Sequence, residues 1–367
     1  MPTTFKDLTL REGAQVPGLE ITEDAGMAVL DALDALGVDC VEIAFPRANP
    51  RASWYRHADD LGLRTAALAR AVEADVDAAL DVDPDEVEVI VNASDVQLEY
   101  ALGKTREEAL DVLEANVHRA AEGADVGASL MDAVRADNDF LREGARRLAD
   151  AGVDHVTLAD TTGSGTPDQV ADTVAAVADE VGGEIGIAVH THDDLGVAAA
   201  NTLAAVDAGA TSADVTVGGV GERVGNAPLE EVTALLTQRG DDVAIDVSEL
   251  VPACRRVLDA LDVDVPDDKP VLGELAYRHE SGMHTAAMLR EPSTYEPFDP
   301  AVYGGKRELL FGEGTGRGAA RALLADVGAD PTTELVQDAL AAIRDAAERK
   351  GDPLTLVEAR EAVETVV

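Results

Sequence analysis

Two histidines one residue apart are the clearest candidates for chemistry in this chain. His190 and His192 flank Thr191 at the end of an apolar segment that is typical of a β-strand. Because alternate residues of an extended segment point to the same side, both imidazoles could bind one cation. A His-x-His pair also occurs by chance on a solvated strand edge, so a metal site needs a third ligand. Glu12 could supply it, since two histidines and one carboxylate with open positions suit a catalytic divalent metal such as Mg²⁺, Mn²⁺, Co²⁺ or Zn²⁺.

The pattern of apolar and amphipathic segments predicts the secondary-structure elements that would bring these residues together. Short runs of Val, Ile and Ala alternate with amphipathic segments about eight times before residue 245, which is the βα pattern of a parallel sheet. The expected strands are 5–10, 40–45, 65–69, 87–91, 126–129, 155–159, 185–190 and 213–217. An open, doubly wound sheet would need a glycine-rich fingerprint after the first strand, and residues 10–15 (LREGAQ) lack it. We therefore expect an α/β fold: a (β/α)8 TIM barrel over residues 1–245, with residues 246–367 as a helical C-terminal appendage.

Active sites of such barrels lie at the C-terminal ends of the strands, and polar residues of this chain gather there. They are Arg11 and Glu12 after the first expected strand, Glu42 in the second, Asp95 after the fourth, Arg135 after the fifth, Asp160 and Thr161 after the sixth, His190 and His192 at the seventh, and residues 222–226 after the eighth. This placement puts Glu12 on the same face of the barrel as the histidine pair.

Composition excludes several classes of protein. Of the 367 residues, 46% are hydrophobic and 28% are charged, and no apolar run approaches the roughly 18 residues that a membrane span needs. The N-terminus carries Lys6, Asp7, Arg11 and Glu12 where a secretory signal would be apolar, so we expect a cytoplasmic protein with no membrane partner.

The acidic residues are distributed over the whole chain. The net charge of −43 argues against binding to a phosphate backbone, so no nucleic-acid partner is expected. A Lys-poor, Asp-rich, aromatic-poor composition resembles that of cytosolic proteins from salt-accumulating halophiles. The two cysteines, Cys40 and Cys254, are too few for a disulfide framework, and we interpret both as buried small apolar residues.

Six ordered motifs between residues 5 and 317 make the chain recognisable. They are residues 7–15 (DLTLREGAQ), 42–46 (EIAFP), 160–163 (DTTG), 190–196 (HTHDDLG), 219–226 (GVGERVGN), and 279–284 (HESGMH) followed by 294–299 (TYEPFD). With these motifs the sequence resembles the isopropylmalate, homocitrate and citramalate synthases, the Claisen-condensing branch of the DRE-TIM metallolyases. The resemblance implies that acetyl-CoA condenses with a 2-oxo acid to give a 2-hydroxy acid in leucine or lysine biosynthesis.

The resemblance also implies roles for individual residues. The implied metal ligands are Glu12, His190 and His192, with Asn226 in or near the coordination sphere. Arg11 and Glu42 complete the catalytic signature, and Arg11 would place a positive charge beside the oxygen that becomes an alkoxide.

Further implied roles concern the substrates. Arg135 and Thr161 would contact the oxo acid, while His284 and Tyr295, from the appendage, would handle the proton of the acetyl methyl group. The family architecture also implies a homodimer in which the appendage of one chain reaches the neighbouring barrel.

Departures from the family pattern leave the substrate open. Met131 stands where the family usually has Glu, and Gln97 where His is common. Glu12 directly after Arg11 favours a homocitrate synthase, residues 45–46 and 190–196 favour an isopropylmalate synthase, and a citramalate synthase also remains open. The alternatives from other classes are a metal-dependent lyase of the hydroxymethylglutaryl-CoA lyase type and a metabolite sensor without activity.

Overall fold

The computed structural model describes residues 2–367, which form two compact units. The first unit ends at Val265 and the second spans Pro266–Val367. This division falls later than the expected boundary after residue 245, because helix α11 (Leu250–Ala260) packs against helix α2 (Glu23–Leu36) of the barrel. Helix α11, which the sequence places in the appendage, therefore belongs to the first unit.

The first unit is a closed barrel of eight parallel strands in the order β1 to β8. The strands are β1 (Thr4–Asp7), β2 (Cys40–Ala44), β3 (Thr65–Arg70), β4 (Glu86–Asn92), β5 (Asp125–Met131), β6 (His155–Asp160), β7 (Gly186–Thr191) and β8 (Ser212–Val215). Phe5 of β1 pairs with Ala213 of β8, and Lys6 pairs with Cys40 of β2, which closes the ring. The predicted TIM barrel is confirmed.

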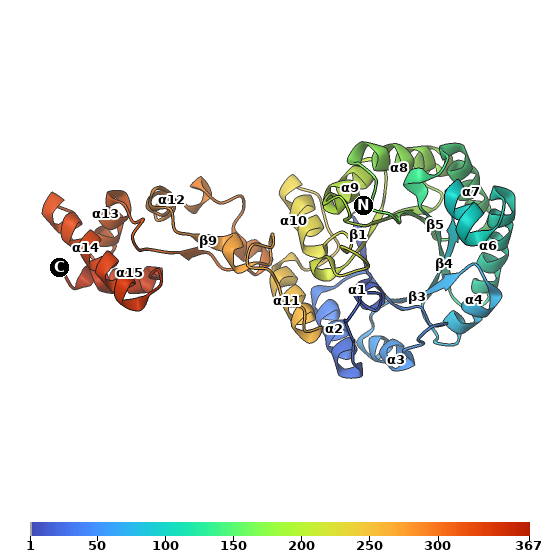
Figure 1. The fold of residues 1–367 in the computed structure, drawn as a ribbon, viewed down its shortest axis with the longest axis horizontal. Helices are drawn as coiled ribbons and strands as arrows, with labels where there is room; N and C mark the ends of the chain where they lie inside the picture. The colour runs from blue at the N-terminus through green and yellow to red at the C-terminus, as the bar shows by residue number, and fades with distance from the viewer. Residues whose placement is uncertain (1) are drawn as a thin grey trace. The chain divides into compact units, whose positions relative to one another are not determined.

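Helices surround this barrel, as the view along it in Figure 1 shows. They are α2, α3 (Ala52–Leu61), α4 (Glu73–Leu80), α6 (Arg106–Ala120), α7 (Asn138–Ala151), α8 (Pro167–Val181), α9 (Ala198–Asp207) and α10 (Leu229–Arg239), with a short α5 (Asp95–Gln97). Side chains cap the N-termini of two of these helices: the side chain of Thr22 accepts a hydrogen bond from the backbone of Ala25, and Thr105 forms a capping box with Glu108. Such caps satisfy backbone N–H groups that have no partner inside the helix.

The first strand ends earlier than the sequence predicts. Residues 5–10 were expected to be extended, but the strand stops at Asp7 and helix α1 (Thr9–Gly13) follows. The Asp7 carboxylate accepts hydrogen bonds from the backbone and the hydroxyl of Thr9, each at 2.9 Å, and this local turn competes with the strand. Arg11 and Glu12 therefore project from a short helix at the C-terminal end of β1.

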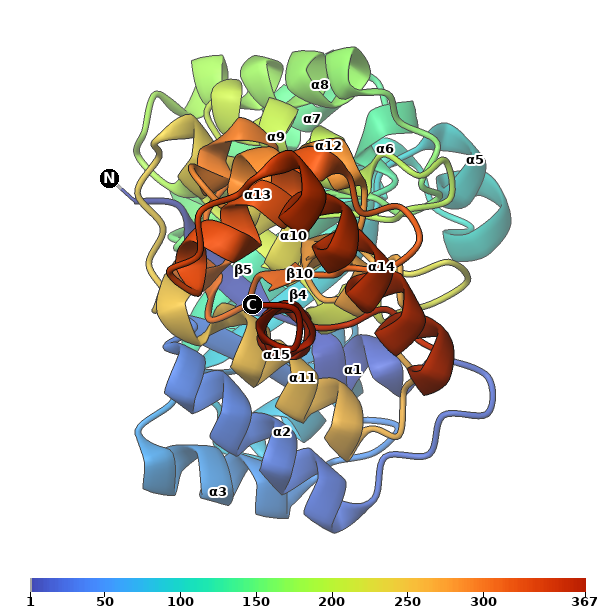
Figure 2. The same ribbon diagram turned by 90° about the vertical axis from the view of Figure 1, so that its left-hand side faces the viewer.

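The second unit has its own small hydrophobic core. It contains β9 (Arg278–His279), α12 (Gly282–Met288), β10 (Glu308–Leu309), α13 (Arg317–Asp326), α14 (Thr333–Lys350) and α15 (Leu356–Glu364). Helices α13, α14 and α15 contact one another (Figure 2), and Phe311, Leu323, Ile343 and Val363 are completely buried among them. The predicted helical character of the C-terminal appendage is thus confirmed.

The structure also bears on the cysteines and on membrane insertion. Cys40 and Cys254 are both buried, as the sequence indicates. Within residues 2–367, no helix is both long enough and apolar enough to span a membrane.

Candidate active site

Glu12, His190 and His192 come together at the C-terminal end of the barrel. His190 lies in β7 and His192 just beyond it, while Glu12 approaches from α1. The Nε2 atom of His190 lies 3.5 Å from a Glu12 carboxylate oxygen and 3.4 Å from Nε2 of His192. All three side chains are buried, and their potential ligand atoms lie within 4.8 Å of one another. The predicted set of residues is therefore close enough to hold one ion.

The surroundings of these ligands fit a divalent metal. The side-chain nitrogen of Asn226 lies 3.2 Å from Nε2 of His190, and its backbone forms an isolated β-bridge with His192. The buried Nδ1 of His192 and Oδ1 of Asn226 have no hydrogen-bond partner among the described residues. Two imidazoles and a carboxylate that converge beside unsatisfied polar atoms form a donor set suited to a catalytic cation.

Asp214, which the sequence analysis did not single out, positions His190. It lies on β8 directly opposite His190 in the strand register, and its carboxylate lies 3.2 Å from Nδ1 of that ring. A proton held on Nδ1 by a carboxylate leaves the Nε2 lone pair free for a metal. The one sequence signal for Asp214 is the alternation of side chains along the predicted strand 213–217, which is consistent with an Asp214 side chain that points into the barrel.

Ion pairs set the charge of the site. The guanidinium of Arg11 donates hydrogen bonds to Glu12 and, at 2.5 Å, to Glu42. Burial raises the pKa of Glu12, but Arg11 and the two histidines outweigh this effect and lower it to about 2. Burial also raises the pKa of Glu42, and the neighbouring charges of Arg11 and Lys6 oppose that rise only in part.

The environment of His192 favours its neutral ring. Burial and the adjacent charge of His190 lower the pKa of His192 to about 3, against a weaker opposing effect of Glu12. A neutral imidazole is the form that binds metals.

A cavity of about 140 Å³ opens beside these residues within the barrel. Its polar lining includes Arg11, Glu42, Thr161, His190 and His192. Its apolar lining consists of Leu68, Ile90, Met131 and Ala159. The predicted site residues Arg11, Glu42 and Thr161 therefore share one cavity with the histidines.

Each of the two units of the chain matches a known protein family. Residues 3–257 match the family described as HMGL-like, and residues 271–351 match the family described as homocitrate synthase post-HMGL domain-like. The chain belongs to the HMGL-like family.

Similar sequences carry the names of three related synthases. The chain is 40% identical over 349 residues to homocitrate synthase AksA of Methanopyrus kandleri, covering 94% of this chain and 87% of the relative. It is 37% identical to a probable 2-isopropylmalate synthase of the same organism, over 92% of this chain and 68% of the relative. It is 38% identical to a putative (R)-citramalate synthase CimA of Methanosphaerula palustris, over 93% and 68%.

The chain is also similar to solved structures of hydroxymethylglutaryl-CoA lyases. The hydroxymethylglutaryl-CoA lyase of Pseudomonas aeruginosa superimposes with a TM-score of 0.63 at 26% identity, covering 72% of this chain and 94% of that one. This likeness agrees with the extent of the HMGL-like match to the first unit.

Arg135 does not reach the cavity of this HMGL-like barrel. It ends a short 3-10 helix, η2 (Ala133–Arg135), and its guanidinium donates hydrogen bonds of 2.6 to 3.0 Å to the carboxylate of Asp132. Its side chain is 42% exposed, whereas the resemblance implies a contact with the oxo acid. The structure therefore pairs Arg135 with a carboxylate of its own chain.

His284 and Tyr295 lie together in the second unit of this HMGL-like chain. Their rings stack with centroids 3.9 Å apart and planes 21° apart, and Tyr295 is 38% exposed. His284 lies in the first turns of α12, while Tyr295 follows a short 3-10 turn at Pro292–Thr294. Their shared role in proton transfer stays a prediction.

Proposed function

We propose that this chain is an acyltransferase that condenses acetyl-CoA with a 2-oxo acid and then hydrolyses the thioester. The observation that carries the proposal is the convergence of Glu12, His190 and His192 beside a cavity that also contains Arg11. The second-unit match and the synthase names of the relatives support the synthetic direction of the reaction.

The chain's own residues would prepare the oxo acid for attack. A divalent metal held by Glu12, His190 and His192 would polarise the ketone as a Lewis acid. Arg11, fixed by its two carboxylate partners, places a permanent positive charge beside the ketone oxygen as that oxygen becomes negative. The hydroxyl of Thr161 accepts a hydrogen bond from the backbone of Asp132, so its own proton is free to donate to the substrate carboxylate.

The acetyl group must lose a methyl proton before it can attack. We propose that the stacked pair His284 and Tyr295 takes this proton and returns one to the alkoxide, within a homodimer. The new bond joins the methyl carbon to the ketone carbon. Water then cleaves the thioester and releases the CoA thiol and a carboxylate.

A CoA-release assay tests this function directly. Acetyl-CoA should release free CoA only when a 2-oxo acid is present, a chelator should abolish this release, and divalent metal should restore it. Glu12→Gln should lower the rate at least about 100-fold, as expected for the loss of a preorganised charged group. Glu20→Gln, the same change at an exposed position, is the matched control. Full activity of the metal-stripped protein would contradict the proposal, and cleavage of hydroxymethylglutaryl-CoA instead would support the lyase.

A further inference from the structure

We infer that the cavity selects a 2-oxo acid with a short apolar side chain, and that Met131 limits the length of that side chain. This inference rests on the proposed function and specifies the substrate class of the same site. Its basis is the distribution of apolar and charged residues around the barrel interior.

The candidate metal ligands and the apolar wall lie on opposite sides of the barrel. His190 and His192 come from β7 and its end, and Glu12 from the helix that follows β1. Leu68, Ile90 and Met131 come from β3, β4 and β5, which lie across the closed ring from β8. An oxo acid held at the histidines by its ketone and carboxylate would therefore direct its side chain toward this apolar wall.

Strand register places Met131 where that side chain would end. His190 is paired with Ala159 on β6, and Ala159 is paired with Met131 on β5. Neighbouring strands lie about 4.8 Å apart. The small side chain of Ala159 on β6 therefore leaves space beside the metal ligands, and the longer side chain of Met131 on β5, the next strand, limits that space. The side chain at position 131 thus sets how far the apolar part of the cavity extends.

The charges of the cavity oppose a second substrate carboxylate. Among the described residues that line it, Arg11 is the single lysine or arginine, and Glu12 and Glu42 already engage it. Glu88 and Asp214 also line the cavity, so a dicarboxylic oxo acid would bring its distal charge among carboxylates. An unpaired buried charge is strongly unfavourable.

Two nearby cations are bound elsewhere and cannot neutralise that charge. Arg135 is paired with Asp132 outside the cavity. The ammonium of Lys6, which does not line the cavity, lies 3.0 Å from Glu86 and 2.7 Å from Glu88. Burial raises the pKa of Glu88, but Lys6 and His155 together hold it well below its usual range, so Glu88 is ionised and already paired with these two side chains.

A substrate panel tests the selectivity. The wild-type protein, supplied with acetyl-CoA and divalent metal, is assayed for CoA release with pyruvate, 2-oxoisovalerate and 2-oxoglutarate. We expect kcat/KM for the better of the two apolar acids to exceed that for 2-oxoglutarate at least about 100-fold, because the distal carboxylate would be desolvated without a partner.

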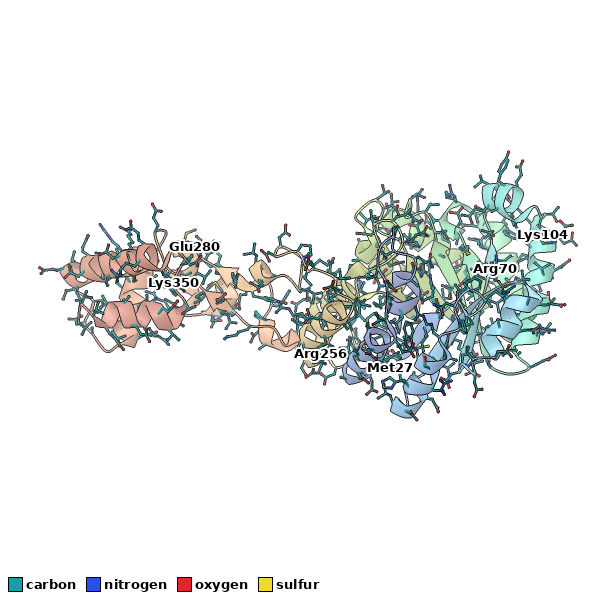
Figure 3. The ribbon with its side chains drawn as sticks, turned by 60° about the horizontal axis from the view of Figure 1, so that its bottom comes forward. Met27, Arg70, Lys104, Arg256, Glu280 and Lys350 are labelled. Carbon is teal, nitrogen blue, oxygen red and sulfur yellow. The ribbon has the colours of Figure 1, made fainter. Side chains whose placement is uncertain are left out.

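Substitution of Met131 tests its role in setting length. Met131→Ala should raise the ratio of kcat/KM for 2-oxohexanoate over pyruvate at least about 10-fold, since each methylene that fits a pocket contributes about 10- to 200-fold. Met131→Val should shift the ratio in the same direction by less, and it provides the test if the alanine variant folds poorly. Met27→Ala is the matched control: Met27 lies on α2, outside the barrel (Figure 3), and this variant should leave the ratio unchanged.

The outcomes separate this inference from the function on which it rests. A preference for 2-oxoglutarate, or a ratio that neither Met131 variant moves, would overturn the inference and leave the condensing activity standing. If none of the three acids supports the release of CoA, the proposed function itself is contradicted.

Discussion

At the scale of single residues, the site depends on how each ligand is held. His190 has Asp214 at its Nδ1 and faces Glu12 and His192 with its Nε2. Glu12 in turn is held by Arg11. His190 and Glu12 therefore each have a charged neighbour that fixes the orientation of the side chain, and such neighbours strengthen metal binding.

Removing the carboxylate beside His190 should weaken metal binding without removing a ligand. Asp214→Asn is expected to lower the affinity for the divalent ion about 10- to 100-fold, because the Nδ1 proton loses its charged acceptor. Titration calorimetry with Mn²⁺ or Zn²⁺ measures this change. Asp172→Asn, on the exposed face of α8, makes the same substitution away from the site and should leave the affinity unaltered. Equal affinity in the Asp214 variant and the wild type would argue against a positioning role.

At the scale of elements, buried charges tie strands of the barrel together below the site. Lys6 of β1 lies between Glu86 and Glu88 of β4, and His155 of β6 lies 3.0 Å from Glu88. Gly127 of β5 is paired with Glu88 on one side and His155 on the other, and a Cβ atom there would lie 2.2 Å from a Glu88 oxygen and 2.5 Å from the His155 ring. The network thus requires glycine at this point of the strand.

This network predicts a dependence of stability on pH. Burial and Lys6 lower the pKa of His155, but Glu88 and Glu86 outweigh them and raise it above 6.5. A histidine with a raised pKa adds stability that is complete below about pH 6.5 and is lost as the pH rises through the folded-state pKa. The thermal midpoint should therefore decrease as the pH rises above about 6.5, and it should decrease less in His155→Asn than in the exposed control His118→Asn. Identical pH profiles in the two variants would exclude this source of stability.

The sequence predicted the elements better than their ends. The eight strands follow from a repeated apolar pattern, which burial on both faces of a barrel strand requires. The end of β1 was predicted wrongly, because the bond between the side chain of Asp7 and Thr9 is a local competition that hydrophobic pattern does not show. The boundary between the units also differs from the expected one, since α11 packs on α2, more than two hundred residues away in the sequence.

The sequence likewise predicted only some residues of the candidate site. Glu12, His190 and His192 could be selected because strand ends of a barrel converge. Asp214 and the cluster around Lys6 could not be selected, because their roles depend on which side chains meet inside the barrel. Arg135 was expected to face the substrate, and the acceptor that holds it, Asp132, is a contact that only the folded turn reveals.

At the scale of the whole molecule, the net charge of −43 should govern stability. Asp and Glu number 72 against 29 Lys and Arg, and surface arginines such as Arg146 and Arg147 already lie between two carboxylates each. Charges repel one another over about 10 Å at 0.1 M salt but only about 3 Å at 1 M. Screening should therefore stabilise the folded chain.

A thermal melt at two salt concentrations tests this effect. We expect the midpoint in about 2 M KCl to lie above that in about 0.1 M KCl, and activity to be highest in molar salt. The same comparison in NaCl separates screening from a specific effect of potassium. A midpoint that is unchanged or lower in 2 M salt would refute the interpretation of the acidic surface as an adaptation to salt.

The condensation itself is tested most directly by following the carbon that forms the new bond. Acetyl-CoA labelled with carbon-13 in its methyl group is incubated with the metal-loaded protein and 2-oxoisovalerate or pyruvate, and the products are examined by carbon NMR. Our account predicts that the label appears in the methylene carbon of a new 2-hydroxy dicarboxylic acid, in an amount equal to the CoA released. Labelled acetate as the only product would show hydrolysis without carbon–carbon bond formation and would contradict the account.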